Sequence, residues 1–201
     1  MRNLKPSEIT EAAKILKNGG LIAFPTETVF GLGVIFDNKE AYDRLNTVKR
    51  RPPEKPYTVM CADIKDVEKF AVLNETSRAL VNKFMPGQFT LITKAQPGLP
   101  SWCVSREGTV GVRIPDLDLV RDMIRLVEKP LLVPSANKSG ETPANTNKEA
   151  ETIFNNEIDA IIEGESRSKV PSTIILVEGN NIKMLREGNV TLSQVMEAIK
   201  K

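Results

Sequence analysis

Residues 109–133, TVGVRIPDLDLVRDMIRLVEKPLLV, contain a strand, a helix and a second strand in succession. From Thr109 to Ile114, apolar residues occupy every second position, which is the period of a half-buried strand. A helix is predicted over 117–128 from apolar residues at helical spacing, Leu117, Val120, Ile124 and Val127. The second strand, 131–133, follows at once, and this succession is typical of α/β proteins.

The same alternation extends over the rest of the chain. Further helices are predicted over 7–17, with Ser7 as N-cap, and over 39–48, 64–70, 75–85, 148–155 and 191–200. Further strands are predicted over 21–24, 29–35, 57–61, 88–94, 158–162, 172–177 and 181–185. Several of these strands lie within hairpin reach of one another, so we predict an α/β layered fold with a mixed sheet.

Composition limits the size and the class of the protein. A chain of 201 residues that is 40% hydrophobic can bury one substantial core, so one domain is expected, with two small lobes as the alternative. Its 28 basic and 26 acidic residues give a net charge of +2, which provides no general attraction to nucleic acid or membrane. No signal peptide or membrane span is recognisable, and two cysteines, Cys61 and Cys103, indicate reduced thiols in a cytoplasmic protein.

The chain contains no histidine. This excludes a Ser-His-Asp triad, a Cys-His nucleophile and an imidazole general base. Phosphoryl and nucleotidyl transfer remain well suited to the chain, because they depend on positioning and charge neutralisation.

A basic run, KRRPPEKP, occupies residues 49–56. Its prolines prevent a helix, and rigidly placed cations at Lys49, Arg51 and Lys55 suit a polyphosphate or an acyl phosphate. The alternative is a solvated helix end, where Lys49 or Arg50 favours the C-terminus of the preceding helix.

Two motifs with short polar side chains follow buried strands. The first, PTETVFGLG over 25–33, presents Thr26, Glu27 and Thr28 where open α/β sheets often hold ligands. The second, SANKSG over 135–140, combines hydroxyls, an amide and a turn backbone that can donate to phosphate oxygens. For both, a turn stabilised by bonds from side chain to backbone remains the alternative.

The polar face of strand 109–114 carries Thr109, Gly111 and Arg113. An arginine beside a glycine can hold a carboxylate, with the glycine leaving room for the ligand, although an ordinary surface arginine fits the same pattern. Two short motifs near the C-terminus, PSTII over 171–175 and LREG over 185–188, add hydroxyls and a further arginine.

These motifs, taken in order, resemble the YrdC/TsaC-type threonylcarbamoyl-adenylate synthases. The family pattern PTET-Y/F-GLG, K-x-R-P, PG-x-x-T, T-x-x-x-R-x-P, S-x-N, STI and LR-x-G is matched at 25–33, 49–52, 86–90, 109–115, 135–137, 172–174 and 185–188. The resemblance implies the family's twisted open sheet with flanking helices and one concave, positively charged cavity. It also implies a single catalytic domain over 1–201, without the additional C-terminal domain of longer members.

The activity implied by the resemblance is the conversion of L-threonine, bicarbonate or CO2, and ATP into threonylcarbamoyl-AMP and pyrophosphate. Partner proteins would then transfer the threonylcarbamoyl group to an adenosine of tRNA. Residues 55–61 and 86–90 are also similar to the YciO-like subgroup. The alternative is therefore a YciO-like RNA-binding or regulatory protein with affinity for tRNA or double-stranded RNA.

Site residues carry over by position. Thr28, Arg113 and Ser172 are expected to bind threonine, with Arg113 on its carboxylate. ATP is expected to meet Arg51, Lys55, Thr109, Ser135, Asn137, Ala144 and Arg186. Catalysis is expected from Lys49, Arg51, Ser135 and Asn137. Mg²⁺ would arrive with ATP, and no protein metal site is expected.

Overall fold

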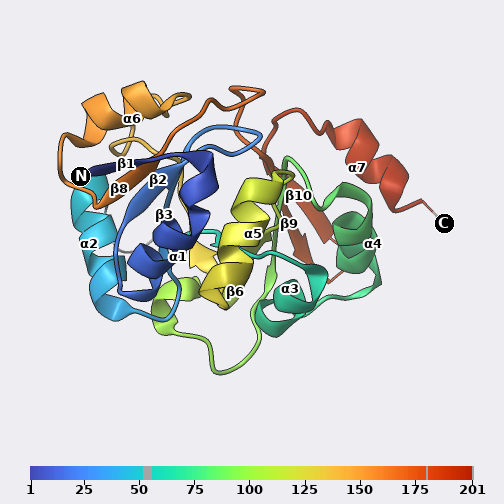
Figure 1. The fold of residues 1–201 in the computed structure, drawn as a ribbon. Helices are drawn as coiled ribbons and strands as arrows, with labels where there is room; N and C mark the ends of the chain where they lie inside the picture. Colours follow the sequence, from blue (N-terminus) through green and yellow to red (C-terminus); the bar gives the residue numbers. More distant parts are fainter. Residues whose placement is uncertain (52–55, 180, 201) are drawn as a thin grey trace.

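The computed structural model describes residues 1–51, 56–179 and 181–200. Within them, ten strands form one open sheet in the order β1-β8-β2-β3-β7-β4-β6-β5-β9-β10 (Figure 1). In chain order the strands are β1 (Arg2–Leu4), β2 (Ile22–Phe24), β3 (Gly31–Ile35), β4 (Val59–Met60), β5 (Phe89–Lys94), β6 (Thr109–Arg113), β7 (Leu131–Leu132), β8 (Ala160–Ile162), β9 (Thr173–Glu178) and β10 (Asn181–Arg186).

The sheet is mixed, as predicted. β1, β8 and β2 run parallel, β2, β3, β7 and β4 are successively antiparallel, and β4 is parallel to β6. At the far end, β5 is antiparallel to β6 and parallel to β9, and β10 returns as a hairpin against β9. The long connections to β6, β7, β8 and β9 therefore bring distant segments of the chain together.

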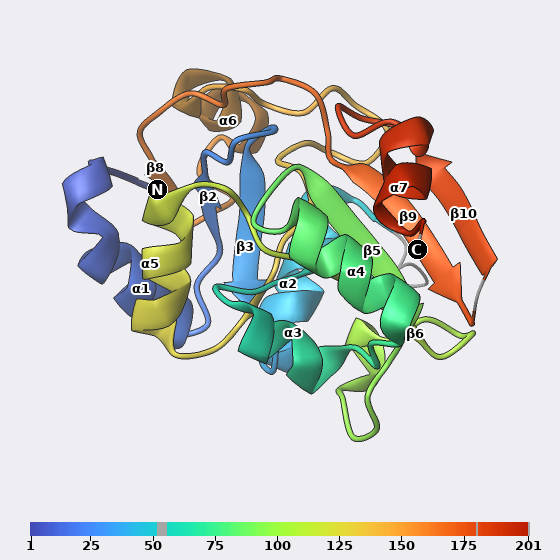
Figure 2. The same ribbon diagram turned by 90° about the vertical axis from the view of Figure 1, so that its right-hand side faces the viewer.

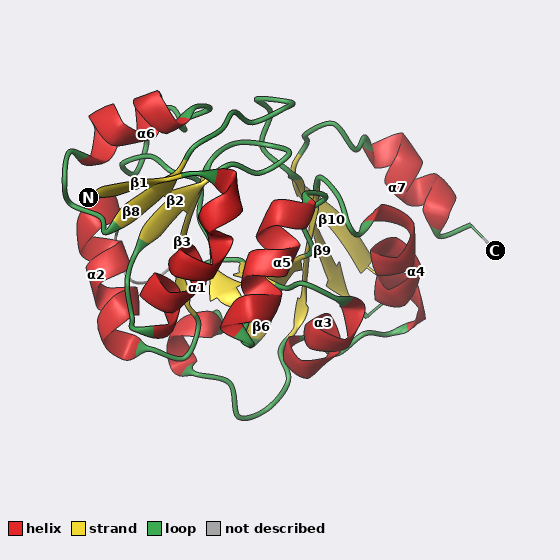
Figure 3. Cartoon of the chain, viewed as in Figure 1, coloured by secondary structure: helices red, strands yellow, loops and turns green. Residues whose placement is uncertain are grey.

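Helices lie on the outside of the sheet (Figure 3). They are α1 (Ile9–Lys17), α2 (Lys39–Lys49), α3 (Ile64–Phe70), α4 (Glu75–Phe84), α5 (Asp118–Val127), α6 (Asn147–Phe154) and α7 (Leu192–Ala198), with short 3₁₀ turns at Pro6–Glu8 and Ser101–Cys103. Asn38, Asn74, Thr146 and Thr191 cap α2, α4, α6 and α7 by accepting a backbone N–H of the first turn.

Three sequence predictions need correction. β1 was not predicted, because a three-residue strand is recognisable only through its distant partner, β8. Ser7 is not the N-cap of α1, since it lies in the 3₁₀ turn and α1 begins at Ile9. The predicted strand 57–61 is shorter, Val59–Met60.

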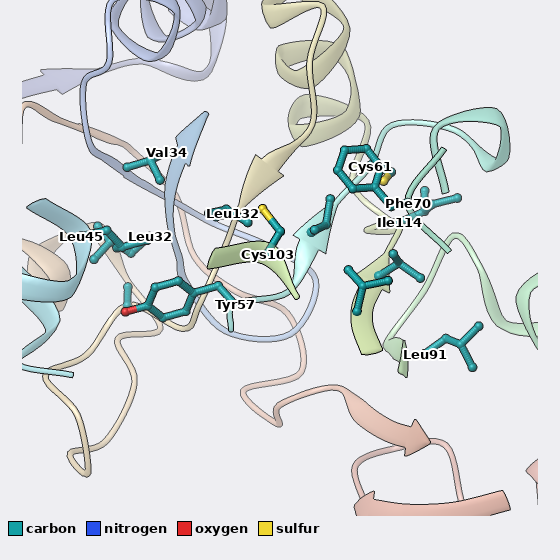
Figure 4. Close-up of a cluster of buried hydrophobic side chains, with 14 of the residues drawn as sticks. Leu32, Val34, Leu45, Tyr57, Cys61, Phe70, Leu91, Cys103, Ile114 and Leu132 are labelled. Atoms are coloured by element: carbon teal, nitrogen blue, oxygen red, sulfur yellow. The ribbon is translucent and has the colours of Figure 1, made fainter. Parts of the chain in front are cut away.

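The two faces of the sheet differ in what covers them. On one face, α1 and α5 pack side by side (Figures 1 and 2), and Leu16 and Ile124 share a buried cluster with Ile22 and Phe24. The other face carries a larger core, including Leu32, Val34, Leu45, Tyr57, Phe70, Leu91 and Leu132, part of which is drawn in Figure 4. Leu45 extends this core into α2, and Phe70 extends it into α3.

The face under α1 and α5 continues toward the candidate site. The pairing of β4 places Met60 beside Leu131 of β7 and beside Arg113 of β6. Because side chains alternate along a strand, Thr109, Gly111 and Arg113 share this face, while Val110 and Val112 are buried in the opposite core. This confirms the predicted two-faced pattern of the strand.

Gly31 and Gly33 have a packing role. A Cβ at Gly33 would lie 2.7 Å from the Phe24 ring, and one at Gly31 would lie 3.2 Å from the same ring. At Gly33 the space is therefore taken by the Phe24 ring of the neighbouring strand, and at Gly31 by that ring together with Val133, whose Cγ1 would lie 2.7 Å away.

Candidate active site

A cavity of about 670 Å³ opens on the polar face of β6. Its lining includes Thr28, Arg51, Thr109, Arg113, Ser135, Ser172 and Arg186, which come from widely separated parts of the chain. Lys49, Asn137 and Ala144 are buried, outside this lining. Lys55 lies outside the described residues. Most of the predicted site residues thus meet around one space.

Arg113 is only 7% exposed, and its charge is balanced by a buried carboxylate. Its Nη2 donates to Glu27 Oε1 at 2.7 Å and to Thr28 Oγ1 at 2.9 Å. Arg113 Nε and Glu27 Oε2 are both buried without a partner. Glu27 and Thr28 therefore both bind Nη2, and neither of them bonds to Nε.

The hydroxyl of Thr28 has a defined orientation. Thr26 Oγ1 donates to the Val29 carbonyl at 2.7 Å, so its proton is already used. The bond of 2.8 Å between Thr26 Oγ1 and Thr28 Oγ1 is then donated by Thr28. Thr28 also accepts from Arg113, which leaves one lone pair of its hydroxyl unused in a fully buried side chain that borders the cavity.

Ser172 belongs to a second network, on the opposite wall. Its hydroxyl lies 2.8 Å from Thr90 Oγ1, and it accepts from Arg186 Nη2 at 3.1 Å. Arg186 Nε donates to the Ser172 carbonyl at 2.8 Å, which fixes the guanidinium against the start of β9. Burial and the nearby charge of Arg113 lower the pKa of Arg186.

Lys49 holds the loop that follows β7. Its Nζ donates to the carbonyls of Ser135 at 2.6 Å and Asn137 at 2.7 Å, and approaches Asn137 Oδ1 at 3.3 Å. Ser135 Oγ donates to Asn137 Oδ1 at 2.6 Å. The three predicted residues thus form one unit, in which Ser135 faces the cavity and Lys49 lies behind it.

The ammonium of Lys49 is in an unfavourable environment. Burial, together with the charges of Arg51 and Lys138, lowers its pKa to about 7. Its oxygen partners stabilise the protonated form and act in the opposite direction.

Lys138 reinforces the same loop from the other side. Its Nζ donates to the Val48 carbonyl at 2.9 Å and pairs with Glu157 at 2.6 Å. The end of α2 and the loop after β7 are therefore joined by two buried lysines, Lys49 from the helix and Lys138 from the loop.

Thr109 and Ala144 have different surroundings. Thr109 lines the cavity, and its Oγ1 lies 2.9 Å from Ser105 Oγ. Ala144 contributes backbone bonds, accepting from the Phe30 N–H and donating to the Ala136 carbonyl, both at 2.9 Å. In this structure Ala144 fixes the two loops that frame the cavity.

Three residues in contact with the site were not among the predicted site residues. Glu27 pairs with Arg113, Thr90 bonds to Ser172, and the ring of Tyr57 lies under Arg51. Of the three, only Glu27 stands out in the sequence, because it is an acidic residue between two apolar strands. The partners of Thr90 and Tyr57 depend on tertiary packing.

The cysteines and the acidic side chains of the described residues do not form a second candidate site. Cys61 and Cys103 are free and buried, and burial raises the pKa of both thiols. Among the described residues, no cluster of three or more histidine, cysteine, aspartate or glutamate side chains could hold a metal. No helix in the described part of the chain is long and apolar enough to cross a bilayer.

Comparison with known proteins identifies the family. The model of the Sua5/YciO/YrdC family, described as "Telomere recombination", matches residues 14–188. The chain belongs to this family. The resemblance inferred from the sequence motifs is thereby confirmed.

Two relatives in the Sua5/YciO/YrdC family are named threonylcarbamoyl-AMP synthase. The Enterobacter sp. (strain 638) protein is 34% identical over 179 residues, which cover 87% of this chain and 94% of that protein. The Pyrococcus abyssi protein is 34% identical over 195 residues, which cover 96% of this chain and 57% of that protein.

Solved structures confirm the fold. P. abyssi Sua5 complexed with L-threonine superposes with a TM-score of 0.92 at 31% identity, over 98% of this chain and 60% of that chain. E. coli YciO shares the fold, with a TM-score of 0.84 at 23% identity over 94% of this chain and 95% of that chain. The chain thus spans about 60% of the Sua5 chain and nearly all of the YciO chain.

Proposed function

We propose that this protein is an L-threonylcarbamoyladenylate synthase, a nucleotidyltransferase that converts L-threonine, bicarbonate or CO2, and ATP into threonylcarbamoyl-AMP and pyrophosphate. The observation that carries the proposal is the gathering of Thr28, Arg51, Arg113, Ser172 and Arg186 around one cavity. Relatives with the same activity in their names, and a threonine complex of a protein with this fold, support it.

The reaction suits the side chains of the cavity. The amine of threonine adds to CO2 with loss of a proton, or to bicarbonate with loss of water. An oxygen of the resulting carbamate then attacks the α-phosphate of ATP as pyrophosphate leaves. Neither step requires an imidazole. Because carbamates decompose readily in water, a cavity that holds the carbamate beside ATP favours the second step through proximity and exclusion of water.

The threonine end is assigned to Arg113, Thr28 and Ser172. The cavity side of the Arg113 guanidinium would receive the carboxylate of threonine as a charged hydrogen-bond partner. Thr28 would offer its remaining lone pair to an N–H or O–H of threonine. Ser172 would contact threonine from the opposite wall, which holds the amino acid between β6 and β9.

The nucleotide end is assigned to Arg51, Arg186 and Ser135, with Thr109 at the β6 edge. The two guanidiniums would neutralise the triphosphate, and Lys55 is proposed to assist them. Lys49 and Asn137 would hold Ser135 toward the α-phosphate, where charge shifts during the reaction. The positive charge of the cavity is part of this proposal, as is Mg²⁺, which would enter bound to ATP.

Further parts of the proposal concern cellular context. The unstable product would be passed to threonylcarbamoyl-transferase proteins that modify tRNA in the cytoplasm. Direct affinity for tRNA or double-stranded RNA is proposed only as a secondary property, since the net charge of +2 gives little general attraction to RNA.

The test is a pyrophosphate-release assay with the purified full-length chain. We expect release that requires ATP, threonine and bicarbonate together, and a product whose mass equals threonylcarbamoyl-AMP. Pyrophosphate that appears equally without threonine would refute the proposal. No release, with RNA bound tightly, would favour the YciO-like alternative.

A further inference from the structure

Arg51 and Arg113 line the same cavity but are supported in different ways. Arg113 is paired with the buried carboxylate of Glu27 at 2.7 Å. Arg51 instead lies over the ring of Tyr57, with its guanidinium carbon 4.7 Å from the ring centre. This distance is well within the range of a cation–π contact.

The supporting ring is itself fixed. Tyr57 is 2% exposed, and its hydroxyl donates to Asn46 Oδ1 at 2.7 Å. The ring of Tyr42 packs edge-on against it at 6.0 Å between centroids. The ring therefore has a defined position at the base of the cavity, and it lines the same space as Arg51.

Asn46 links both members of the pair. Its side chain accepts from the Tyr57 hydroxyl, and its carbonyl accepts from the backbone N–H of Arg51 at 3.0 Å. One residue of α2 therefore bonds both to the backbone of Arg51, just beyond the end of the helix, and to the side chain of Tyr57. The contact between the Arg51 guanidinium and the Tyr57 ring is the third link among these three residues.

The two kinds of support have different electrostatic consequences. A carboxylate partner neutralises an arginine and competes with an incoming anion for its N–H groups. An aromatic ring carries no negative charge, so it supports the guanidinium without neutralising it and without the charged hydrogen bonds that a carboxylate would accept. Arg51 therefore suits the more highly charged anion, and Arg113 suits a single carboxylate.

We propose that Tyr57 is a positioning residue for Arg51. The ring of Tyr57 contacts the Arg51 guanidinium and fixes it where the polyphosphate binds in the cavity. This inference rests on the proposed function for the identity of the anion. The inference adds Tyr57 to the site. It also distinguishes Arg51 from Arg113 by the partner that supports each guanidinium.

The experiment measures binding of inorganic pyrophosphate by calorimetry to the full-length chain and to variants, together with KM for ATP and for threonine. Tyr57→Leu removes the ring, Tyr57→Phe keeps it without the bond to Asn46, and Phe70→Leu removes a buried ring outside the cavity lining as a control. We expect Tyr57→Leu to weaken pyrophosphate binding about tenfold and to raise KM for ATP by a similar factor, with KM for threonine unchanged.

The controls separate positioning from stability. Tyr57→Phe is expected to bind pyrophosphate within about twofold of the unmodified chain, and Phe70→Leu to lose thermal stability without losing affinity. Pentafluorophenylalanine at position 57 keeps the ring shape but removes its negative face. It therefore tests the same contact if Tyr57→Leu does not fold, and we expect it to bind pyrophosphate several-fold more weakly than Tyr57→Phe.

Two results would overturn the inference. One is an unchanged pyrophosphate affinity in a folded Tyr57→Leu or pentafluorophenylalanine variant. The other is an unmodified chain that binds no pyrophosphate. Ring-dependent binding of pyrophosphate without threonine-dependent turnover would retain the role of Tyr57 and reject the synthase function, so the two proposals fail separately.

Discussion

Arg113 and Glu27 form a buried ion pair whose role in folding is separable from its role in binding. Removal of one member of such a pair leaves an uncompensated charge, whereas replacement of both members is often close to neutral. The pair therefore offers a way to remove the proposed carboxylate site while the fold is kept.

The first prediction uses this property. Arg113→Met is expected to lower the free energy of unfolding by about 3–5 kcal/mol, because Glu27 is left unpaired. The double variant Glu27→Gln, Arg113→Met should recover most of that loss and still bind threonine more weakly by about 2–5 kcal/mol. Urea unfolding and calorimetry measure the two effects, and a double variant with unchanged threonine affinity would remove Arg113 from the site.

The second prediction concerns Lys49. Its pKa is about 7 in the folded chain and 10.5 ordinarily, so between these values the unfolded chain binds more protons. Folding stability attributable to Lys49 should then rise with pH across this window, by up to about 1.4 kcal/mol per pH unit, and be constant below pH 7.

Unfolding measured at pH 6, 7.5 and 9 checks this when the chain is compared with Lys49→Met. We expect the stability difference between the two proteins to shift in favour of the unmodified chain as pH rises. A difference independent of pH would show that Lys49 keeps its ordinary pKa in the fold.

At the scale of single residues, the sequence motifs predicted which residues surround the cavity, but not which side chains these residues bond to. Arg113 was predicted to contact a carboxylate, and the pair with Glu27 joins residues 86 positions apart that no local pattern connects. Lys49 could be read either as a helix end or as a ligand group. It is the last residue of α2, and it is also bound to the loop after β7.

At the scale of elements, β6 and the turn after β10 contain glycines with opposite requirements. A Cβ at Gly111 would meet ordinary contacts, the nearest 3.5 Å away, and would point to the cavity face. A Cβ at Gly188 would collide with the Pro171 carbonyl and lie 2.9 Å from the backbone nitrogen of Thr173. One glycine leaves space for a ligand, and the other permits packing.

The third prediction compares these two glycines. Gly111→Ala is expected to change the free energy of unfolding by less than about 1 kcal/mol while weakening substrate binding, because the methyl group occupies cavity space. Gly188→Ala is expected to cost about 1–3 kcal/mol through overpacking. Thermal unfolding and threonine titration of both variants provide the test, and a Gly111→Ala variant with normal binding would show that no ligand contacts this part of β6.

Long periodic elements were predictable, whereas short ones were not. The alternation of 109–114 and the helical spacing of 117–128 gave β6 and α5 nearly to the residue, because each buries a continuous apolar face. β1 and the shortened β4 depend on pairing with strands distant in the chain. Their limits are set by tertiary partners.

At the scale of the whole molecule, the topology of the sheet explains the site. The order β7-β4-β6-β5-β9-β10 places the loops after β2, α2 and β7 beside the polar face of β6 and the start of β9. Ordered motifs predicted this convergence only through resemblance to a family, since no local pattern states that residues 28 and 186 meet. The fold class followed from periodicity alone.

The central claim is that one cavity holds an amino acid beside a nucleotide. A crystal structure of the full chain with L-threonine and a non-hydrolysable ATP analogue tests it most directly. We expect the threonine carboxylate on Arg113, the phosphates against Arg51 and Arg186, and the amine close enough to the α-phosphate for one carbon unit to bridge them. Threonine and nucleotide bound in separate regions of the molecule would contradict the claim.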